Sequence, residues 1–164
     1  MTVIHLDKDL DAKVLTLVAE FDAPIERVWE LWADPRQLER WWGPPTYPST
    51  FEEHDLTSGG RVSYYMTGPQ GDKSRGWWRI TALEPPRSLE FEDGFADQDG
   101  QPVADMPTTT VRMTLTEDGG RTRMELRSAF ESREAMQQLV DMGMAEGLQQ
   151  SVGQMDALLA PKAV

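Results

Sequence analysis

The final stretch of the chain, residues 132–160, constrains the fold most, because it is the longest apolar segment with helical periodicity. Ser132 can cap its first turn with a hydroxyl group, and Pro161, directly after it, cannot continue a helix. Apolar residues recur along it every three or four positions, as on one face of an amphipathic helix. The pattern predicts a C-terminal helix that buries one face against the rest of the protein.

The apolar face of this helix changes direction near its middle. The first apolar set surrounds Leu139, and the second runs from Leu148 to Leu159. At about 100° per residue, the two sets point roughly 110° apart. We therefore predict a break between Met142 and Met144, with a short helix before it and a longer helix after it.

Two glycines, Gly143 and Gly147, lie at and just after the predicted break. Each costs about 1 kcal/mol relative to alanine inside a helix, so another factor should favour them. The more ordinary explanation is that a neighbouring backbone packs closely against them. The alternative is that they leave space beside the helix for a bound molecule.

Three segments of the second half alternate strictly between apolar and polar residues. They are residues 88–93, 109–116 and 121–130, and the pair Gly119–Gly120 joins the last two as a hairpin. Such alternation is typical of an antiparallel sheet with one covered face and one solvated face. We expect the C-terminal helix to cover the apolar face.

The first half predicts four further strands, at residues 14–21, 51–56, 61–67 and 73–83. Two short helices are predicted after the first of these strands. Pro24 suits the first helical position, the pair Asp34–Pro35 separates the two helices, and Gly43 ends the second. Residues 93–107 lack periodicity and are expected to form a mobile loop or lid.

These elements predict an α+β fold in which a curved antiparallel sheet of about seven strands wraps around a long C-terminal helix. The length of 164 residues suits a single domain. We expect its core to span residues 14–159, with residues 1–12 and 161–164 as tails.

Composition excludes several classes of function. The chain has no cysteine, which rules out disulfides, thiolate metal sites and cysteine nucleophiles. Its net charge of −12 would repel nucleic acids and anionic membranes. No apolar run reaches the ~18 residues needed to span a bilayer, and the first eleven residues do not resemble a signal peptide. We expect a cytoplasmic protein.

Few residues could support metal binding or nucleophilic catalysis. The two histidines, His5 and His54, lack a second ligand at helical or strand spacing, and residues 97–100 supply only part of a calcium loop. His54 also has no identifiable serine or threonine partner, so it reads as a satisfied or surface histidine. The acidic residues at positions 52, 53 and 55 read as a solvated edge. We expect neither a metal nor another cofactor.

An apolar cavity between sheet and helix is the remaining candidate site, since such cavities are lined by aromatic and methionine side chains. Most buried aromatic residues simply fill a core, so core packing competes with ligand binding at each position. The candidate ligand-binding residues are Trp42, Tyr64, Trp78, Phe91, Met113, Met124, Leu148, Val152 and Met155.

The order of these elements resembles the helix-grip fold of the START and Bet v 1-like (SRPBCC) superfamily. More closely, the chain resembles the family named for the C-terminal domain of the activator of Hsp90 ATPase. The resemblance covers residues 14–159 and rests on an ordered set of motifs. They are Phe21–Pro24 with Val28 and Trp29, Trp41–Pro44, Asp55, Gly59–Gly60, Pro85–Pro86 before Leu89, and Gly147.

Two positions depart from the pattern of that family. Members often have an arginine where this chain has Thr57, and a tryptophan where it has Leu148. The smaller Leu148 would enlarge or reshape a cavity at that point, so the identity of a ligand cannot be transferred from relatives.

Three functions follow as hypotheses. The first is a non-enzymatic module that binds a small apolar or amphipathic ligand, as the superfamily suggests. The second is an interaction domain associated with a chaperone, which predicts an exposed apolar patch near Trp41 and Trp42 or in residues 93–107. The third is a cyclase-like or hydrolytic enzyme, which requires a titratable group inside the cavity. The sequence identifies no such group.

Overall fold

The computed structural model describes residues 3–159 of the chain. Its strands are β1 (Val3–Asp9), β2 (Val14–Phe21), β3 (Ser49–His54), β4 (Arg61–Thr67), β5 (Lys73–Glu84), β6 (Ser88–Ala96), β7 (Thr109–Asp118) and β8 (Arg121–Phe130). Its helices are α1 (Ile25–Ala33), α2 (Pro35–Leu38), α3 (Arg133–Asp141), α4 (Met144–Gly153) and α5 (Met155–Leu159).

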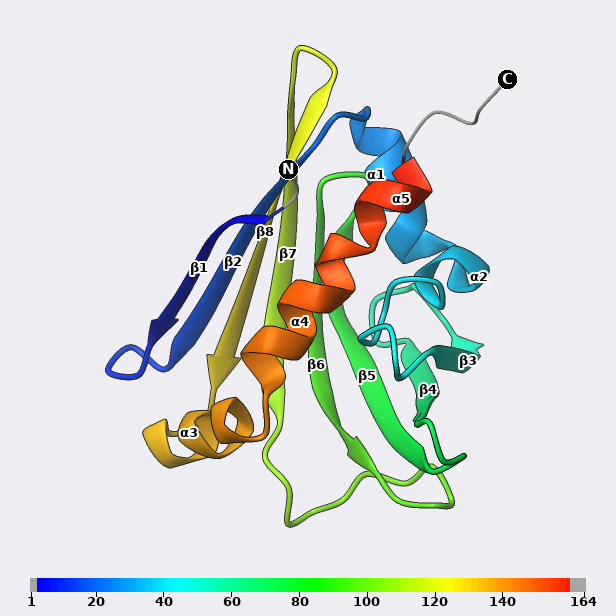
Figure 1. Cartoon of the computed structure of the whole chain (residues 1–164), viewed down its shortest axis with the longest axis vertical. Coiled ribbons are helices and arrows are strands. Elements are labelled where there is room, and N and C mark those ends of the chain that lie inside the picture. The colour runs from blue at the N-terminus through cyan, green and yellow to red at the C-terminus, as the bar shows by residue number, and fades with distance from the viewer. Residues whose placement is uncertain (1–2, 160–164) are drawn as a thin grey trace.

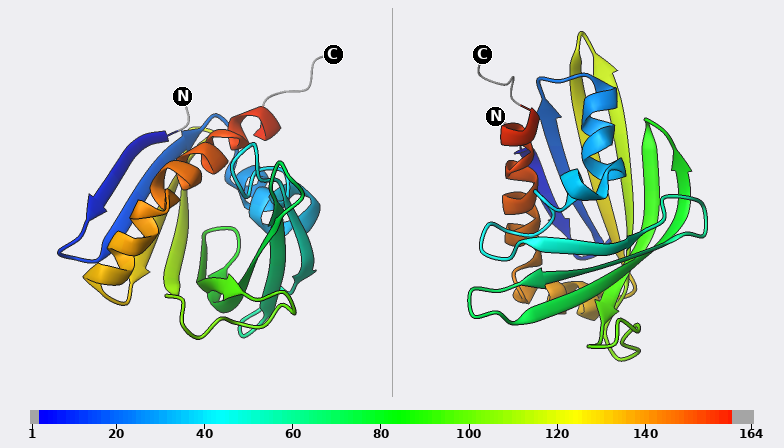
Figure 2. Two further views of the ribbon diagram at one scale, coloured as in Figure 1. Left: turned by 60° about the horizontal axis from the view of Figure 1, so that its bottom comes forward. Right: turned by 90° about the vertical axis from the view of Figure 1, so that its right-hand side faces the viewer.

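All eight strands form one antiparallel sheet in the order β1-β2-β8-β7-β6-β5-β4-β3. Figure 1 shows α4 and α5 crossing the sheet diagonally, and Figure 2 shows that the sheet curves around the helices. This is the helix-grip α+β fold, as the sequence predicts. No helix within residues 3–159 is long and apolar enough to cross a membrane.

The sheet has eight strands rather than the expected seven because one further strand precedes residue 14. Val3–Asp9 forms β1, which pairs with β2 at one edge of the sheet. Within β1, Leu6 packs against both apolar clusters of the core, whereas the neighbouring Asp7 is exposed. Because charged residues follow Leu6, this segment lacks the apolar alternation from which a strand is predicted. The expected C-terminal tail, residues 161–164, lies outside the described residues, as does Ala160 at the predicted end of the terminal helix.

The first two helices fill much of the interior. From α1, Val28, Leu31 and Trp32 are fully buried in the main core cluster, together with Trp41 from the segment after α2. The helix starts at Ile25, so Pro24 precedes it rather than occupying its first turn. The second helix ends at Leu38, earlier than predicted, and the chain continues through turns to Gly43.

The predicted break in the C-terminal helix is confirmed, although the segment after it is divided at Gln154 into α4 and α5 rather than forming one longer helix. Gly143 separates α3 from α4 and adopts a left-handed conformation with φ of 89°, which glycine tolerates best. Close approach of another backbone does not explain the glycines. An added Cβ at either Gly143 or Gly147 would have no other heavy atom within 4 Å. The space beside Gly147 is open.

The region predicted as a loop begins later than expected. Residues 93–96 belong to β6, and only the following residues form the connection to β7. Pro102 pairs with Ala96 through an isolated bridge, and Asp97 accepts hydrogen bonds from the backbone N–H groups of Asp99 and Gln101. The extension of β6 places Asp93 within the sheet.

Candidate functional site

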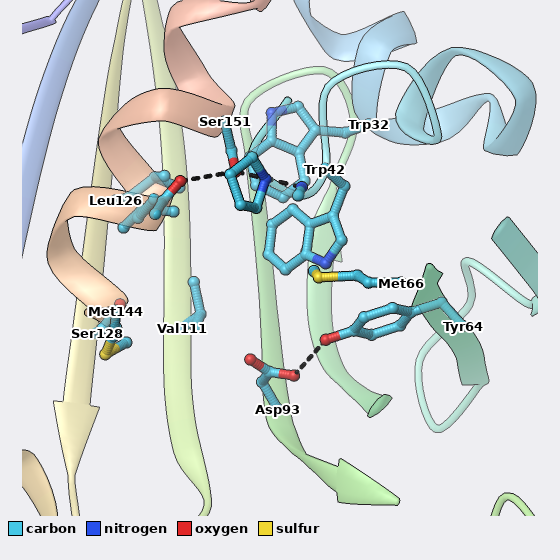
Figure 3. A pocket seen from close by; sticks show the side chains of 14 residues that line it. Trp32, Trp42, Tyr64, Met66, Asp93, Val111, Leu126, Ser128, Met144 and Ser151 are labelled. Atoms are coloured by element: carbon cyan, nitrogen blue, oxygen red, sulfur yellow. Dashed lines mark hydrogen bonds between the residues drawn. The ribbon is translucent and has the colours of Figure 1, made fainter. Parts of the chain in front are cut away.

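A cavity of about 220 Å³ lies between the concave face of the sheet and the first turns of α4. Figure 3 shows side chains from strands, helices and the segment after α2 converging on it. Its lining comprises Trp32, Trp42, Gly43, Pro44, Tyr64, Met66, Asp93, Val111, Leu126, Ser128, Met144, Gly147, Leu148 and Ser151. The cavity is smaller than the roughly 300–1,000 Å³ typical of pockets for drug-sized ligands. It suits a small molecule.

The α4 side of the cavity is open because Gly147 has no side chain. Ser151, one turn later, is fixed by two hydrogen bonds: its hydroxyl donates to the carbonyl of Gly147 (2.8 Å) and accepts from the backbone N–H of Gly43 (3.2 Å). These bonds tie α4 to the segment that carries Trp42. They leave the apolar side chains of Met144 and Leu148 to form the wall.

One polar pair, Tyr64 and Asp93, borders the otherwise apolar cavity. The hydroxyl of Tyr64 on β4 donates a hydrogen bond to Oδ1 of Asp93 on β6 (3.3 Å). Figure 3 shows the two side chains pointing toward each other below Trp42. Burial raises the pKa of the Asp93 carboxyl to about 7, although the bonds from Tyr64 and the Gly94 N–H oppose the rise. Near neutral pH this carboxyl therefore exists in both protonation states.

Burial also raises the pKa of the Tyr64 hydroxyl, and the nearby Asp93 charge adds to the increase. Tyr64 therefore remains neutral and acts as a hydrogen-bond donor at neutral pH. Its ring stacks on Phe51 of β3, with ring centroids 5.0 Å apart.

A glycine opposite Tyr64 gives its ring room. In the register of β4 and β5, Tyr64 faces Gly76, and a Cβ at Gly76 would lie 2.5 Å from Cζ and the hydroxyl oxygen of Tyr64. The next strand pair repeats the arrangement, because Trp77 faces Gly94 and a Cβ there would lie 2.6 Å from the indole. Glycines inside strands often mark such close approaches. Gly76 thus positions the hydroxyl that contacts Asp93.

Three buried indole N–H groups, those of Trp32, Trp42 and Trp78, have no hydrogen-bond acceptor among the described residues. The indole nitrogen of Trp42 lies on the side of its ring that faces Met66 and Tyr64 (Figure 3). The N–H groups of Trp42 and Trp78 moderate the rise in the pKa of Tyr64, yet neither makes a hydrogen bond of acceptable geometry with it. Leaving a buried donor unpaired costs about 1–3 kcal/mol of stability. The N–H of Trp42 is therefore a hydrogen-bond donor in the cavity wall that is free to bind an acceptor.

A second cavity of about 180 Å³ also borders the polar pair. It shares Tyr64, Met66, Asp93 and Met144 with the first, and it is otherwise lined by residues of β5, β6, β7, α3 and the segment before β7. Asp93 is therefore accessible from two spaces. A ligand longer than the first cavity could extend past the carboxyl group.

The structure brings three of the nine sequence-predicted ligand residues to the first cavity: Trp42, Tyr64 and Leu148. The other six do not line it but belong to the hydrophobic core: Trp78, Phe91, Met113, Met124, Val152 and Met155. Trp78 and Phe91 stack on each other with centroids 4.0 Å apart. The sequence patterns of strands and helix correctly placed these six inside the protein, but they could not separate cavity wall from packed interior.

Asp93 lines the cavity but is not among the ligand residues predicted from the sequence. In β6, Leu89 and Phe91 face inward, and one further step of two residues reaches Asp93. The predicted strand ended at this residue, so Asp93 was assigned to the start of a loop. Met66, two residues after Tyr64 in β4, could have been found by the same alternation.

The histidine and the acidic residues considered for catalysis take no part in the cavity. His54 lies on the edge strand β3, where its Nε2 bonds to the backbone carbonyl of Trp32 (3.2 Å), and burial lowers its pKa. It is thus a satisfied histidine, as predicted. Glu52 and Glu53 pair with arginines on the surface. No group of three metal-ligating side chains occurs in the described part of the chain.

The exposed apolar patch predicted for a chaperone-binding surface is not formed at the two tryptophans. Trp41 is fully buried and donates its indole N–H to the carbonyl of Leu31 (2.8 Å), while Trp42 faces the cavity. Within residues 5–159, Met142 is the one large apolar side chain that is exposed, at 58%.

Known proteins with the same fold include two close relatives. An NMR structure of a protein from Arthrobacter aurescens is 53% identical, with a TM-score of 0.94, over 99% of this chain and 94% of that one. The crystal structure of protein Ms6760 from Mycobacterium smegmatis is 49% identical, with a TM-score of 0.90, over 99% of both chains.

An NMR structure of a protein from Staphylococcus epidermidis shares the fold, with 24% identity and a TM-score of 0.83 over 98% of each chain. No curated protein is significantly similar to this chain. Residues 22–160 match the model of the family described as activator of Hsp90 ATPase homolog 1-like protein. With the helix-grip fold and two relatives of about half identical sequence, the chain belongs to the activator of Hsp90 ATPase homolog 1-like family.

Proposed function

We propose that the protein binds a small, largely apolar molecule with one polar end in the cavity between the sheet and α4. The observation that carries this proposal is an apolar cavity bordered by one polar pair, the buried Tyr64 and the half-buried Asp93. Binding sites for small molecules typically combine apolar walls with a few placed polar groups. The helix-grip fold and the family both support a binding role.

The size and shape of the cavity limit the ligand. Trp42, Leu126 and Leu148 provide a broad apolar wall, which suits an aromatic or branched aliphatic body. The polar end lies near Asp93, where Tyr64 and the indole N–H of Trp42 are also within reach of the space.

Binding of 2-phenylethanol, measured by calorimetry, tests this proposal, because the molecule has an aromatic body and one hydroxyl group. A Gly147→Leu variant would fill the open side of the cavity, and Gly153→Leu is its matched control. Gly153 also belongs to α4 and has space for a side chain, but it does not line the cavity.

The proposal predicts measurable binding to the wild-type protein and to Gly153→Leu, with affinity at least tenfold lower for Gly147→Leu. Equal binding by both variants would contradict it, as would absence of binding to the wild type by 2-phenylethanol and by its amine and carboxylate counterparts alike.

A second candidate function, proton transfer to or from a bound molecule, is favoured by one observation. Asp93 borders the cavity, and its pKa of about 7 suits a general acid or base at neutral pH. In ester hydrolysis, the carboxylate would take a proton from water as the water oxygen attacks the carbonyl carbon and the alkoxide leaves.

Hydrolysis of 4-nitrophenyl acetate, followed by release of 4-nitrophenolate, tests this second candidate. The expected result is a rate that rises with pH through about 7 and is lost in Asp93→Asn. A rate unchanged by the substitution would exclude Asp93 as the base.

A further inference from the structure

The cavity is bordered by a carboxyl group, that of Asp93, which has no ion-pair partner among the described residues. None of the ion pairs among the described residues involves Asp93. A buried carboxylate normally acquires a positive partner or stays protonated, because ionisation in a low-dielectric site is costly. The partner that would let Asp93 ionise freely is absent from this part of the protein.

The described strands and helices around Asp93 supply no positively charged side chain that is free to pair with it. Among the residues that line the second cavity, the cation is Arg75 of β5. Its guanidinium pairs with Glu52 (2.8 Å) and lies over the ring of Tyr65 (Cζ 5.1 Å from the centroid). From β4, the titratable group facing Asp93 is the hydroxyl of Tyr64. The neighbouring β7, α3 and α4 contribute uncharged residues to the cavity walls: Thr109, Val111, Leu139 and Met144.

Besides Asp93, two features favour positive charge, although the indole N–H of Trp42 is a donor and offers a cation no acceptor. The rings of Trp42 and Tyr64 border the same space, and aromatic rings attract cations through the negative potential of their π faces. At long range, the net charge of −12 raises the local concentration of cations and repels anions. A ligand with a positive end would therefore meet attraction both on approach and inside the cavity.

We infer that the ligand is a small organic amine, whose ammonium group pairs with Asp93 while its apolar body lies against Trp42 and Leu148. This inference rests on the proposed function and specifies its substrate class. The ammonium group donates to the carboxylate oxygen that Tyr64 leaves free, so the Tyr64–Asp93 hydrogen bond is retained. No bond other than hydrogen bonds forms or breaks.

Three probes with one phenyl body separate the possible ligand classes: 2-phenylethylamine, 2-phenylethanol and 3-phenylpropanoate. They present a cation, a neutral group and an anion at the same end. Calorimetric titration at pH 8 is expected to rank the amine tightest and the carboxylate weakest. The amine should bind about tenfold or more tightly than the alcohol, as charge-assisted hydrogen bonds are stronger than neutral ones.

The pH dependence identifies the group responsible. An aliphatic amine stays protonated well above pH 8. Its affinity should therefore follow the ionisation of Asp93 and increase roughly thirtyfold from pH 5.5 to pH 8, given a pKa of about 7. Binding of 2-phenylethanol should change little over this range.

Asp93→Asn removes the charge and keeps the shape of the side chain. It should reduce the affinity for the amine at pH 8 by about tenfold to a hundredfold and abolish its pH dependence, while the alcohol binds nearly as before. Tyr64→Phe is the matched control, since it removes the other hydrogen-bonding group but keeps the carboxylate, and it should retain tighter binding of the amine than of the alcohol.

The outcomes separate this inference from the function on which it rests. Alcohol binding equal to or tighter than amine binding at pH 8, or amine binding unaffected by Asp93→Asn, overturns the amine as ligand but leaves the cavity as a binding site. Failure of all three probes to bind overturns both.

Discussion

Asp93 reduces the stability of the empty protein at neutral pH. Its folded-state pKa of about 7 lies well above the ~3.9 of an unfolded chain, so the folded protein binds a proton more tightly. The free energy of unfolding therefore falls as pH rises from about 4 to 7 and levels off above that range. At the scale of residues, the site combines the carboxyl group of Asp93, whose ionisation lowers stability, with Tyr64, whose ring fits only because Gly76 opposite it has no side chain.

Substitution of Asp93 by asparagine should stabilise the protein more at alkaline than at acidic pH. Because the neutral amide cannot ionise, its advantage over aspartate should be about 1–2 kcal/mol larger at pH 8 than at pH 5.5. Urea denaturation of both proteins at the two pH values measures this difference. An advantage that is the same at both pH values would contradict the raised pKa.

Gly76→Ala should disturb Tyr64. The added Cβ would lie 2.5 Å from the ring, so the ring or the strand must shift, at a cost of about 1–3 kcal/mol in the free energy of unfolding. In a Tyr64→Ala background the same substitution should cost much less. Urea denaturation of the four proteins forms a double-mutant cycle, and an unchanged cost in that background would show that the contact with Tyr64 is not responsible.

At the scale of elements, the break between α3 and α4 shapes the cavity. The left-handed Gly143 ends one helix and starts the next, and the first turns of α4 then place Met144, Gly147 and Leu148 along the cavity wall. The two glycines, four residues apart, thus serve different purposes. Gly143 provides the left-handed backbone conformation, and Gly147 provides space beside the helix.

Alanine substitutions at these glycines should have opposite effects on stability. Gly143→Ala forces a residue with a Cβ into the left-handed region and should destabilise the protein by about 1 kcal/mol. Gly147→Ala meets no neighbouring atom and should stabilise α4 by up to about 1 kcal/mol through higher helix propensity. Thermal unfolding of both variants checks this, and changes of the same sign would contradict the assignment.

The sequence was sufficient for most elements because alternation and helical periodicity are local. The predicted strands 14–21, 61–67 and 121–130 have the bounds of β2, β4 and β8, and the shift of the apolar face located the break at Gly143. Strand β1 was missed because its core contact through Leu6 is surrounded by charged residues.

The candidate site was harder to predict, because it depends on contacts between distant segments. The Tyr64–Asp93 bond joins residues 29 positions apart, and the room for Tyr64 comes from the register with Gly76. Neither can be derived from local periodicity. For the same reason, alternation could not show that Trp78 and Phe91 stack within the core while Trp42 borders the cavity.

At the scale of the whole molecule, the acidic surface governs long-range behaviour. The net charge of −12 is what remains after every Lys and Arg has offset one carboxylate. Each ion pair among the described residues has at least one side chain that is more than half exposed. Exposed pairs contribute little to stability, whereas like-charge repulsion acts across the entire surface.

Added salt should therefore stabilise the protein. Raising NaCl from about 0.01 to 0.15 M shortens the Debye length from ~30 to ~8 Å and screens repulsion between distant carboxylates. We expect the free energy of unfolding at pH 8 to increase by about 1 kcal/mol. Urea denaturation at the two salt concentrations measures it. A decrease would mean that native ion pairs outweigh the repulsion.

Binding of a probe inside the cavity is the most direct test of the proposed site. In protein labelled with ¹³C at the methionine methyl groups, Met66 and Met144 report on the cavity wall, and the exposed Met142 serves as an internal control. We predict that 2-phenylethylamine at pH 8 shifts the Met66 and Met144 signals in a saturable manner and leaves that of Met142 unchanged. Unshifted cavity methionines at saturating probe, or shifts confined to Met142, would contradict a binding site between the sheet and α4.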